Sequence, residues 1–420
     1  MRNNDYFKEK KILIVGFARS GIASANLLYG LGAQVFVTDN QDNDSTRQNI
    51  SKLKSKEIKI ELGRHSQDFM RGKDLVIISP GVPNDALPIL RARKEGIPVI
   101  SEIELAWILC PAEVIAITGT NGKTTVTTLI GKVLEAGGKN TRICGNIGSP
   151  FCLEVEDMKR GDFVALEISS FQLENVDTFK PRIAVILNLS CNHLDRYKDM
   201  QDYLAAKKRI FRNQDTADYL VLNYDDPVIR DLAQEAKSKV IYFRKVDGLD
   251  PNQSAVLTVA SILGINKDLA KKVFSEFKGV EHRLEEVLKI NGVRFINDSK
   301  STTTEATLWA LNNLAGPLVL IAGGREKGND YRLVLELARQ KVKAVILIGE
   351  AKERIKKEFS GHIRLDEAAS LEEAVKKAYS LARSGESVLF SPMCKSFDMF
   401  SNYEERGRLF KNLVSKLSGS

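Results

Sequence analysis

The chain has 420 residues, with 62 Lys and Arg against 54 Asp and Glu, and a formal net charge of +8 at pH 7. At roughly 100–200 residues per domain, this length predicts two to four domains. With 43% hydrophobic and 28% charged residues, the composition excludes a collagen-like or disordered chain. No run of about 18 apolar residues is present, so no membrane-spanning helix is predicted, and no secretory signal is expected at the N-terminus.

The cysteines and the positive charges are both scattered along the chain. An odd number of cysteines without a CxxC pair predicts neither a disulfide framework nor a zinc site, and favours a reducing compartment. Because the lysines and arginines form no long basic arm, we expect anion-binding pockets on a solvated surface, and no nucleic-acid track. The cysteines are Cys110, Cys144, Cys152, Cys191 and Cys394.

Short apolar runs alternate with helical patterns along the whole chain, which is typical of βαβ units and a mostly parallel sheet. The first series of predicted strands is Lys11–Val15, Gln34–Val37, Asp74–Ser79 and Pro98–Ile100. The second is Val114–Ile117, Phe163–Ile168 and Ala184–Asn188, and the third is Val293–Ile296, Leu318–Ala322, Ala344–Ile348 and Ser387–Phe390. We therefore predict three α/β domains, at residues 1–101, 102–279 and 280–420.

A glycine-rich turn follows the first predicted strand. Gly16 to Gly21 has the G-x-G-x-x-G frame with Ala18 at the second glycine, where a dinucleotide pyrophosphate normally approaches the backbone. Asp39 ends the second strand, where an acid can accept a hydrogen bond from a sugar or base. A nucleotide site, including one for NAD, and a plain tight turn both fit this pattern.

A second loop indicates nucleotide binding more specifically than the first glycine-rich turn does. The strand Val114–Ile117 leads into Thr118-Gly-Thr-Asn-Gly-Lys-Thr-Thr125 and then a helical run. Backbone N–H groups at a helix start, Lys123 and the Thr124 hydroxyl are the parts of a phosphate cradle with its Mg²⁺. This shortened phosphate loop predicts ATP or GTP binding, which a hydride-transfer enzyme does not need.

Further polar residues follow later strands. Glu167 ends the strand after the loop, and His193 follows the next one, so both would reach the crevice at the carboxyl ends of the sheet. Each residue alone also fits a structural role, and Lys207 alone fits a solvated helix lysine. Asp298 and Lys300 follow the strand Val293–Ile296, where a third domain could close over a nucleotide.

Several motifs in one order resemble a known family. They are GTNGKTT, LEISSFQLE, HLDRY, INDSK, GGREKG and FSPMCKSFDMFSNYEERG. From Ile12 to about Gly407 the chain resembles the Mur ligases, ATP-dependent amide-forming enzymes of peptidoglycan precursor synthesis, and within them the branch that adds D-glutamate.

The resemblance implies an architecture and a reaction. The N-terminal Rossmann-like domain would bind a UDP-linked substrate, the central P-loop-type ATPase domain would bind ATP and two Mg²⁺ ions, and the C-terminal Rossmann-like domain would bring D-glutamate. The substrates would be UDP-N-acetylmuramoyl-L-alanine and D-glutamate, joined through an acyl phosphate in the cytoplasm. We expect a monomer with no nucleic-acid or membrane partner.

The resemblance also implies residue roles. The expected catalytic residues are Lys123, Glu167, His193 and Lys207, and the expected metal ligands are Thr124, Glu167, His193 and Lys207 as a carbamate. ATP would be bound by Gly119, Thr120, Asn121, Gly122, Lys123, Thr124, Thr125, Arg283 and Asp298. The UDP substrate would contact Arg19, Ser20, Asp39, Ser79, Asn146 and His193, and D-glutamate would contact Lys300, Thr302, Lys327, Ser396 and Tyr403.

The chain departs from the branch at its adenine contacts. Family members carry H-N-x-x-N where this chain has Asp250 to Ser254, and the segment between Asp226 and Asp250 looks short. The alternatives left open are another Mur-type ligase, a folylpolyglutamate-type ligase, a nucleotide-gated binding protein and, on the first glycine turn alone, a nicotinamide oxidoreductase.

Overall fold

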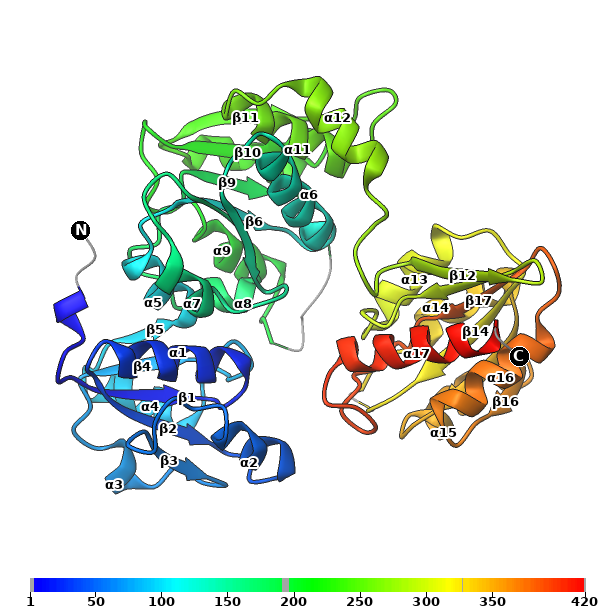
Figure 1. Cartoon of the computed structure of the whole chain (residues 1–420), viewed down its shortest axis with the longest axis horizontal. Helices are drawn as coiled ribbons and strands as arrows, with labels where there is room; N and C mark the ends of the chain where they lie inside the picture. Colours follow the sequence, from blue (N-terminus) through cyan, green and yellow to red (C-terminus); the bar gives the residue numbers. More distant parts are fainter. Residues whose placement is uncertain (1–3, 191–195, 327, 419–420) are drawn as a thin grey trace. The chain divides into compact units, whose positions relative to one another are not determined.

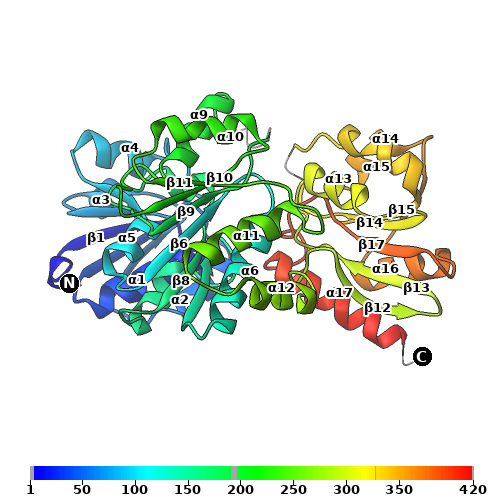
Figure 2. The ribbon, with the colours of Figure 1, turned by 90° about the horizontal axis from the view of Figure 1, so that it is seen from above.

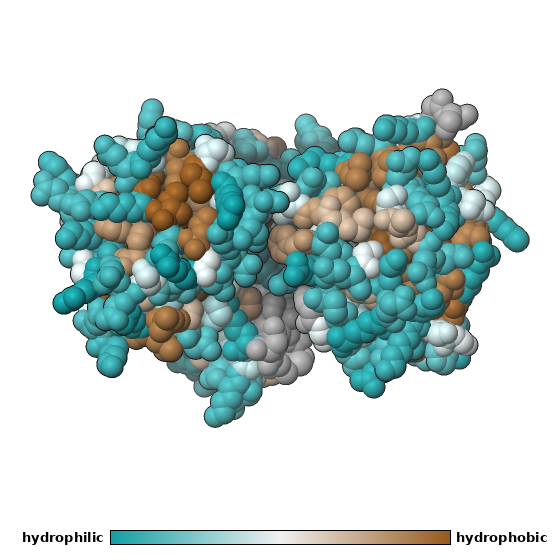
Figure 3. Space-filling view, turned by 90° about the horizontal axis from the view of Figure 1, so that it is seen from below, coloured by the Kyte–Doolittle hydropathy of each residue, from teal (hydrophilic) through white to brown (hydrophobic). Residues whose placement is uncertain are grey.

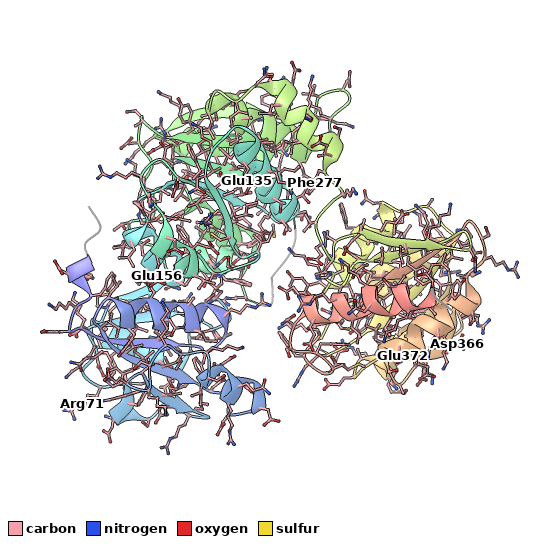
Figure 4. The ribbon with its side chains drawn as sticks, viewed as in Figure 1. Arg71, Glu135, Glu156, Phe277, Asp366 and Glu372 are labelled. Atoms are coloured by element: carbon pink, nitrogen blue, oxygen red, sulfur yellow. The ribbon has the colours of Figure 1, made fainter. Side chains whose placement is uncertain are left out.

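The computed structural model describes residues 4–190, 196–326 and 328–418, which fold into two compact units, Met1–Phe277 and Lys278–Ser420. Phe277, labelled in Figure 4, ends the first unit just after the helix α12. The first unit holds two sheets and the second holds one, and each sheet is flanked by helices (Figures 1 and 2). The predicted three-domain α/β architecture is confirmed, whereas the exact domain boundaries stay predictions.

The first sheet is parallel throughout, in the order β3-β2-β1-β4-β5. Its strands are β1 (Lys11–Val15), β2 (Gln34–Asp39), β3 (Lys59–Leu62), β4 (Leu75–Ile78) and β5 (Val99–Ser101). The helical segments are η1 (Asn4–Tyr6), α1 (Arg19–Gly30), α2 (Asp44–Ile50), α3 (Gln67–Met70), α4 (Leu87–Lys94) and α5 (Glu102–Leu109).

The second sheet is also parallel, in the order β11-β10-β9-β6-β8-β7. Its strands are β6 (Glu113–Thr118), β7 (Thr141–Gly145), β8 (Phe163–Glu167), β9 (Ile183–Ile186), β10 (Tyr219–Asn223) and β11 (Lys239–Phe243). The helical segments are α6 (Lys123–Ala136), α7 (Phe151–Glu154), η2 (Val155–Asp157), α8 (Ser170–Leu173), α9 (Met200–Lys208), α10 (Pro227–Asp231), η3 (Leu232–Glu235), α11 (Pro251–Ile262) and α12 (Lys267–Glu276).

The third sheet has the order β12-β13-β17-β14-β15-β16 and is parallel except for the hairpin of β12 and β13. Its strands are β12 (Glu285–Ile290), β13 (Val293–Asn297), β14 (Leu318–Gly323), β15 (Val342–Ile348), β16 (Arg364–Glu367) and β17 (Ser387–Phe390). Its helices are α13 (Thr304–Asn312), α14 (Arg332–Lys341), α15 (Lys352–Phe359), α16 (Leu371–Leu381) and α17 (Tyr403–Leu417).

Buried apolar strands explain the parallel sheets. Along β6, Val114 and Ala116 belong to one core cluster, and Ile115 and Ile117 belong to another on the opposite face. Successive side chains of a strand point to opposite faces, so a strand covered on both sides is apolar throughout. The face shown in Figure 3 is mainly hydrophilic with scattered apolar patches.

Two buried acids of α5 tie the first sheet's last helix to the second sheet. The Glu104 carboxylate accepts hydrogen bonds from the backbone N–H groups of Asp177, Thr178 and Phe179, at 2.7–3.1 Å. The Glu102 Oε1 atom accepts one from the Cys152 N–H at 2.6 Å. One core cluster also includes residues of both sheets. The two sheets therefore pack as one unit.

Candidate active site

The phosphate loop has the predicted setting, between β6 and α6. Gly119 (φ 152°) and Gly122 (φ 82°) both have positive φ, and a Cβ on Gly122 would collide with the Asn252 side chain. Glycine is therefore required at Gly122 on two grounds. Gly122 caps α6 and no side chain caps the helix start, which carries Lys123, Thr124 and Thr125 in its first turn. An anion at this position would be stabilised by the helix dipole.

Asn188 fixes the loop, and the sequence analysis did not select it as a site residue. Its Oδ1 accepts hydrogen bonds from the N–H groups of Thr120 (3.1 Å) and Asn121 (2.8 Å), and its Nδ2 donates to the Asn121 carbonyl (3.1 Å). One feature of the sequence could have identified Asn188: it follows β9 directly, and β9 lies next to β6, so Asn188 is at the carboxyl edge of the sheet near the loop.

Two lysines converge on one carbonyl oxygen of the loop. Lys123 Nζ donates to the Gly119 oxygen at 3.0 Å and to the Thr120 oxygen at 2.9 Å. Lys207 Nζ, from α9, donates to the same Gly119 oxygen at 3.0 Å and lies 4.5 Å from the centre of the Tyr203 ring. The structure thus brings Lys207 to the phosphate loop, which helix periodicity could not predict.

Lys207 is 1% exposed. Burial, followed by repulsion from Lys123, lowers the pKa of Lys207 well below its usual value. Among the described residues no carboxylate pairs with Lys207. A buried ammonium without such a partner is costly, and a neutral amine is the form that can react with CO₂. The carbamate expected here would be an oxygen ligand beside the cationic Lys123.

Glu167 is also almost completely buried, at the end of β8. Its Oε1 accepts a hydrogen bond from Asn146 Nδ2 at 2.8 Å, and the Asn146 N–H donates to the Glu167 carbonyl at 2.8 Å. The second oxygen, Oε2, is buried and has no hydrogen-bond partner among the described residues. An unpartnered carboxylate oxygen fits a divalent cation, so the donor set of Glu167 with the Thr124 hydroxyl is suited to Mg²⁺.

Four of the residues predicted for the UDP substrate gather around the first glycine turn; Asn146 lies elsewhere, and His193 falls outside the described residues. The Asp39 carboxylate accepts hydrogen bonds from the Phe17 N–H (2.7 Å) and the Gln41 N–H (2.8 Å). Ser79 Oγ donates to the Gly16 carbonyl at 3.0 Å. Arg19 and Ser20 begin α1, which has no side-chain cap. Asp39 and Ser79 therefore brace the turn, and the open start of α1 is available to an anion.

The third sheet positions a separate group of predicted residues. Asp298 is completely buried and accepts hydrogen bonds from Ser391 Oγ (2.7 Å) and the Leu284 N–H (3.2 Å). Burial raises the pKa of its carboxyl. The Arg283 guanidinium lies 4.8 Å from the Trp309 ring centre, which is cation–π range.

Two of the residues predicted for D-glutamate, Lys300 and Ser396, lie in segments that a buried arginine holds. Arg406 Nε donates to Ser299 Oγ at 3.0 Å, and its NH2 and NH1 groups donate to the carbonyls of Ser299 (2.8 Å) and Cys394 (3.1 Å). These contacts hold the segments that carry Lys300 and the buried Ser396. Lys300 Nζ lies 5.9 Å from the Tyr403 ring centre.

For the remaining predicted residues the structure gives one further contact. The Thr302 N–H donates to the Lys300 carbonyl at 2.9 Å. His193 and Lys327 lie outside the residues that the structure describes.

Three family models match the chain in order. They are the Mur ligase MurD-like N-terminal domain at residues 10–101, the Mur ligase middle domain at 117–272 and the Mur ligase glutamate ligase domain at 282–394. The UDP-N-acetylmuramoylalanine–D-glutamate ligase of Thermoanaerobacter pseudethanolicus is 40% identical, and the alignment covers 98% of this chain and 99% of that protein. The protein of the same name from Koribacter versatilis is 41% identical, with 97% and 98% covered.

Solved structures of other ligases share the fold. The UDP-N-acetylmuramate-alanine ligase of Thermotoga maritima has a TM-score of 0.63 at 20% identity, covering 97% of this chain and all of that one. The MurF ligase of the same organism, solved with ADP, has a TM-score of 0.60 at 16% identity, covering 99% and 98%. The fold and the site define an ATP-dependent ligase, and the chain belongs to the Mur ligase family. Among the described residues no helix is long and apolar enough to cross a membrane.

Proposed function

We propose that this ligase joins D-glutamate to the L-alanyl carboxylate of UDP-N-acetylmuramoyl-L-alanine, with conversion of ATP to ADP and phosphate. The supporting observation is the 40% identity, over nearly the whole of both chains, to ligases named for this reaction. The phosphate loop, with the buried Glu167 and Lys207, supports the proposal because these groups suit a triphosphate and a divalent cation.

The reaction needs an activated acyl donor because a carboxylate is a poor electrophile. ATP would phosphorylate the L-alanyl carboxylate, the amine of D-glutamate would attack the acyl phosphate, and phosphate would leave from the tetrahedral intermediate. Lys123 and the N–H groups at the start of α6 would hold the β- and γ-phosphates and stabilise the charge on the transferred group. Bound Mg²⁺ would neutralise negative charge and align the reacting oxygens.

The other residues would hold the substrates and the metal. We propose Thr124 and Glu167 as ligands of one Mg²⁺, and His193 with carbamylated Lys207 as ligands of a second. Asn146 and the residues around the first glycine turn would contact the UDP substrate.

The third sheet would carry the remaining contacts. Arg283 and Asp298 would bind ATP, and cations and hydroxyls suit the two carboxylates of D-glutamate. These D-glutamate contacts would come from Lys300, Thr302, Lys327, Ser396 and Tyr403.

We propose that the enzyme acts in the cytoplasm as a monomer. The described cysteines are all free thiols, which fits a reducing compartment.

A substrate panel tests the proposed function. ADP formation should require UDP-N-acetylmuramoyl-L-alanine and D-glutamate together, and L-glutamate should not replace D-glutamate. Turnover with L-glutamate and a folate, but not with the sugar nucleotide, would instead assign a folylpolyglutamate-type activity.

A further inference from the structure

A cavity of about 820 Å³ lies between the end of β11, the loop after it, and the helices α11 and α12. These two helices pack against α6 on one side of the second sheet (Figure 2). None of the residues predicted to bind ATP, metal or either substrate lines the cavity, although Gln253 and Ser254, from the segment that stands at the family's adenine contacts, line one part of it. Its volume is within the range of pockets that hold small molecules, about 300–1,000 Å³.

The cavity carries an excess of positive charge. Arg244, Lys267 and Lys271 line it, and Asp247 is the one acid among the lining residues. Within the described parts of the chain, neither Lys267 nor Lys271 has an acidic group within 4.0 Å. They stand one helical turn apart on α12, so their like charges face the same side and repel each other. An anion between them would relieve this repulsion.

The rest of the lining combines apolar side chains with the uncharged polar residues Gln253, Ser254, Thr258, Ser261 and Ser275. Val246 and Leu249 contribute from the loop, Leu257 from α11 and Phe274 from α12. A bare inorganic anion would leave this apolar surface in contact with water, whereas a ligand with an apolar body would cover it. The lining therefore suits a ligand that carries a negative group and an apolar group in one molecule.

We propose that the cavity binds a small organic anion, with its apolar, ring-sized body against Leu257 and Phe274 and its negative group between Lys267 and Lys271. This site is separate from the phosphate loop, and the inference does not rest on the proposed function.

The probe is 8-anilinonaphthalene-1-sulfonate, which joins aromatic rings to one sulfonate and fluoresces in apolar surroundings. The full-length protein should bind it saturably at one site. Benzenesulfonate should displace it, but benzylammonium, which has the same ring, and methanesulfonate, which has the same charged group, should not. Equal displacement by benzylammonium would overturn the anion assignment, and displacement by methanesulfonate at the same concentration would overturn the need for an apolar body.

Variants locate the bound probe. The double variant Lys267→Glu, Lys271→Glu should bind it about tenfold more weakly because two attractions become repulsions. Lys272→Glu makes the same charge change on the same helix, but Lys272 faces Glu276 (4.0 Å) and does not line the cavity. It should change the affinity by less than about twofold.

A filling variant gives an independent check. Ser261 is an exposed residue of α11 that lines the cavity, and Ser261→Trp should abolish probe binding while the melting temperature and ADP formation are retained. Unchanged binding by the double variant or by Ser261→Trp would overturn the proposal. Complete displacement of the probe by Mg²⁺–ATP would do so too, because the cavity would then belong to the nucleotide site.

Discussion

Glu167 is the residue on which metal-dependent chemistry should depend most strongly. Its Oε2 is buried and finds no hydrogen-bond partner in the part of the chain that the structure describes, and its Oε1 is held by Asn146. We expect Glu167→Gln to lower kcat on the order of 100-fold or more, because the substitution removes an anionic metal ligand while conserving shape. Steady-state ADP formation measures this loss. Equal turnover by the variant and the wild type would contradict the metal-ligand role of Glu167.

Asn146 should act through Glu167. The bond to Oε1 orients the carboxylate, and loss of such a supporting bond typically weakens metal binding by about 10–100-fold. We therefore expect Asn146→Ala to raise the Mn²⁺ dissociation constant by about tenfold, measured by electron paramagnetic resonance. Asn140→Ala, outside the predicted site, is the control and should bind Mn²⁺ like the wild type. Unchanged Mn²⁺ affinity in Asn146→Ala would contradict the supporting role.

Lys207 should be carbamylated because burial lowers the pKa of its amine and so favours the neutral form that reacts with CO₂. We expect Lys207→Ala to lose about 100-fold in activity, since a metal ligand is lost, and short carboxylic acids to restore part of it. The neighbouring Lys208 pairs with Glu235, so Lys208→Ala should retain wild-type activity. ¹³CO₂ should give a carbamate signal by NMR in the wild type and in Lys208→Ala. Absence of the signal, together with no rescue, would contradict the assignment.

At the scale of elements, α5 contains a pH-sensitive contact with α7. Burial raises the pKa of Glu102 to about 7. The folded protein therefore keeps a proton that the unfolded chain releases above about pH 4.5, and stability falls as the pH rises from there towards 7.

Glu102→Gln removes this titration. Between pH 5 and pH 8 we expect the unfolding free energy of the wild type to fall by up to about 3 kcal/mol more than that of the variant. Urea denaturation at the two pH values measures the difference. Glu113→Gln, at the exposed start of β6, should behave like the wild type. Parallel pH profiles for the wild type and Glu102→Gln would contradict a titrating Glu102.

The sequence predicted the buried strands better than the edges of the sheets. The run Lys11–Val15 is reproduced residue for residue as β1, and Ser387–Phe390 as β17. The edge strands β3 and β16, with sequences KIEL and RLDE, were not predicted. An edge strand is partly exposed and carries charged residues, so it lacks the apolar run that marks an interior strand.

The candidate site was predicted where chemistry lies next to a strand end, and missed where it depends on contacts between distant segments. The phosphate loop and Glu167 follow from local patterns, and the structure gives both the expected settings. The bonds from Asn188 to the loop and from Asn146 to Glu167 join residues 67 and 21 positions apart. No periodicity encodes such contacts, because they arise from the order of strands in the sheet.

For the whole molecule, the central proposal is that ATP activates the sugar nucleotide's own carboxylate. The most direct test uses UDP-N-acetylmuramoyl-L-alanine labelled with ¹⁸O in both carboxylate oxygens, with ATP and D-glutamate. The C–O bond of the acyl phosphate breaks when the amine attacks, so we expect each phosphate released to carry one ¹⁸O atom by mass spectrometry. Unlabelled phosphate formed in step with ADP would contradict the claim, because ATP would then have been hydrolysed by water.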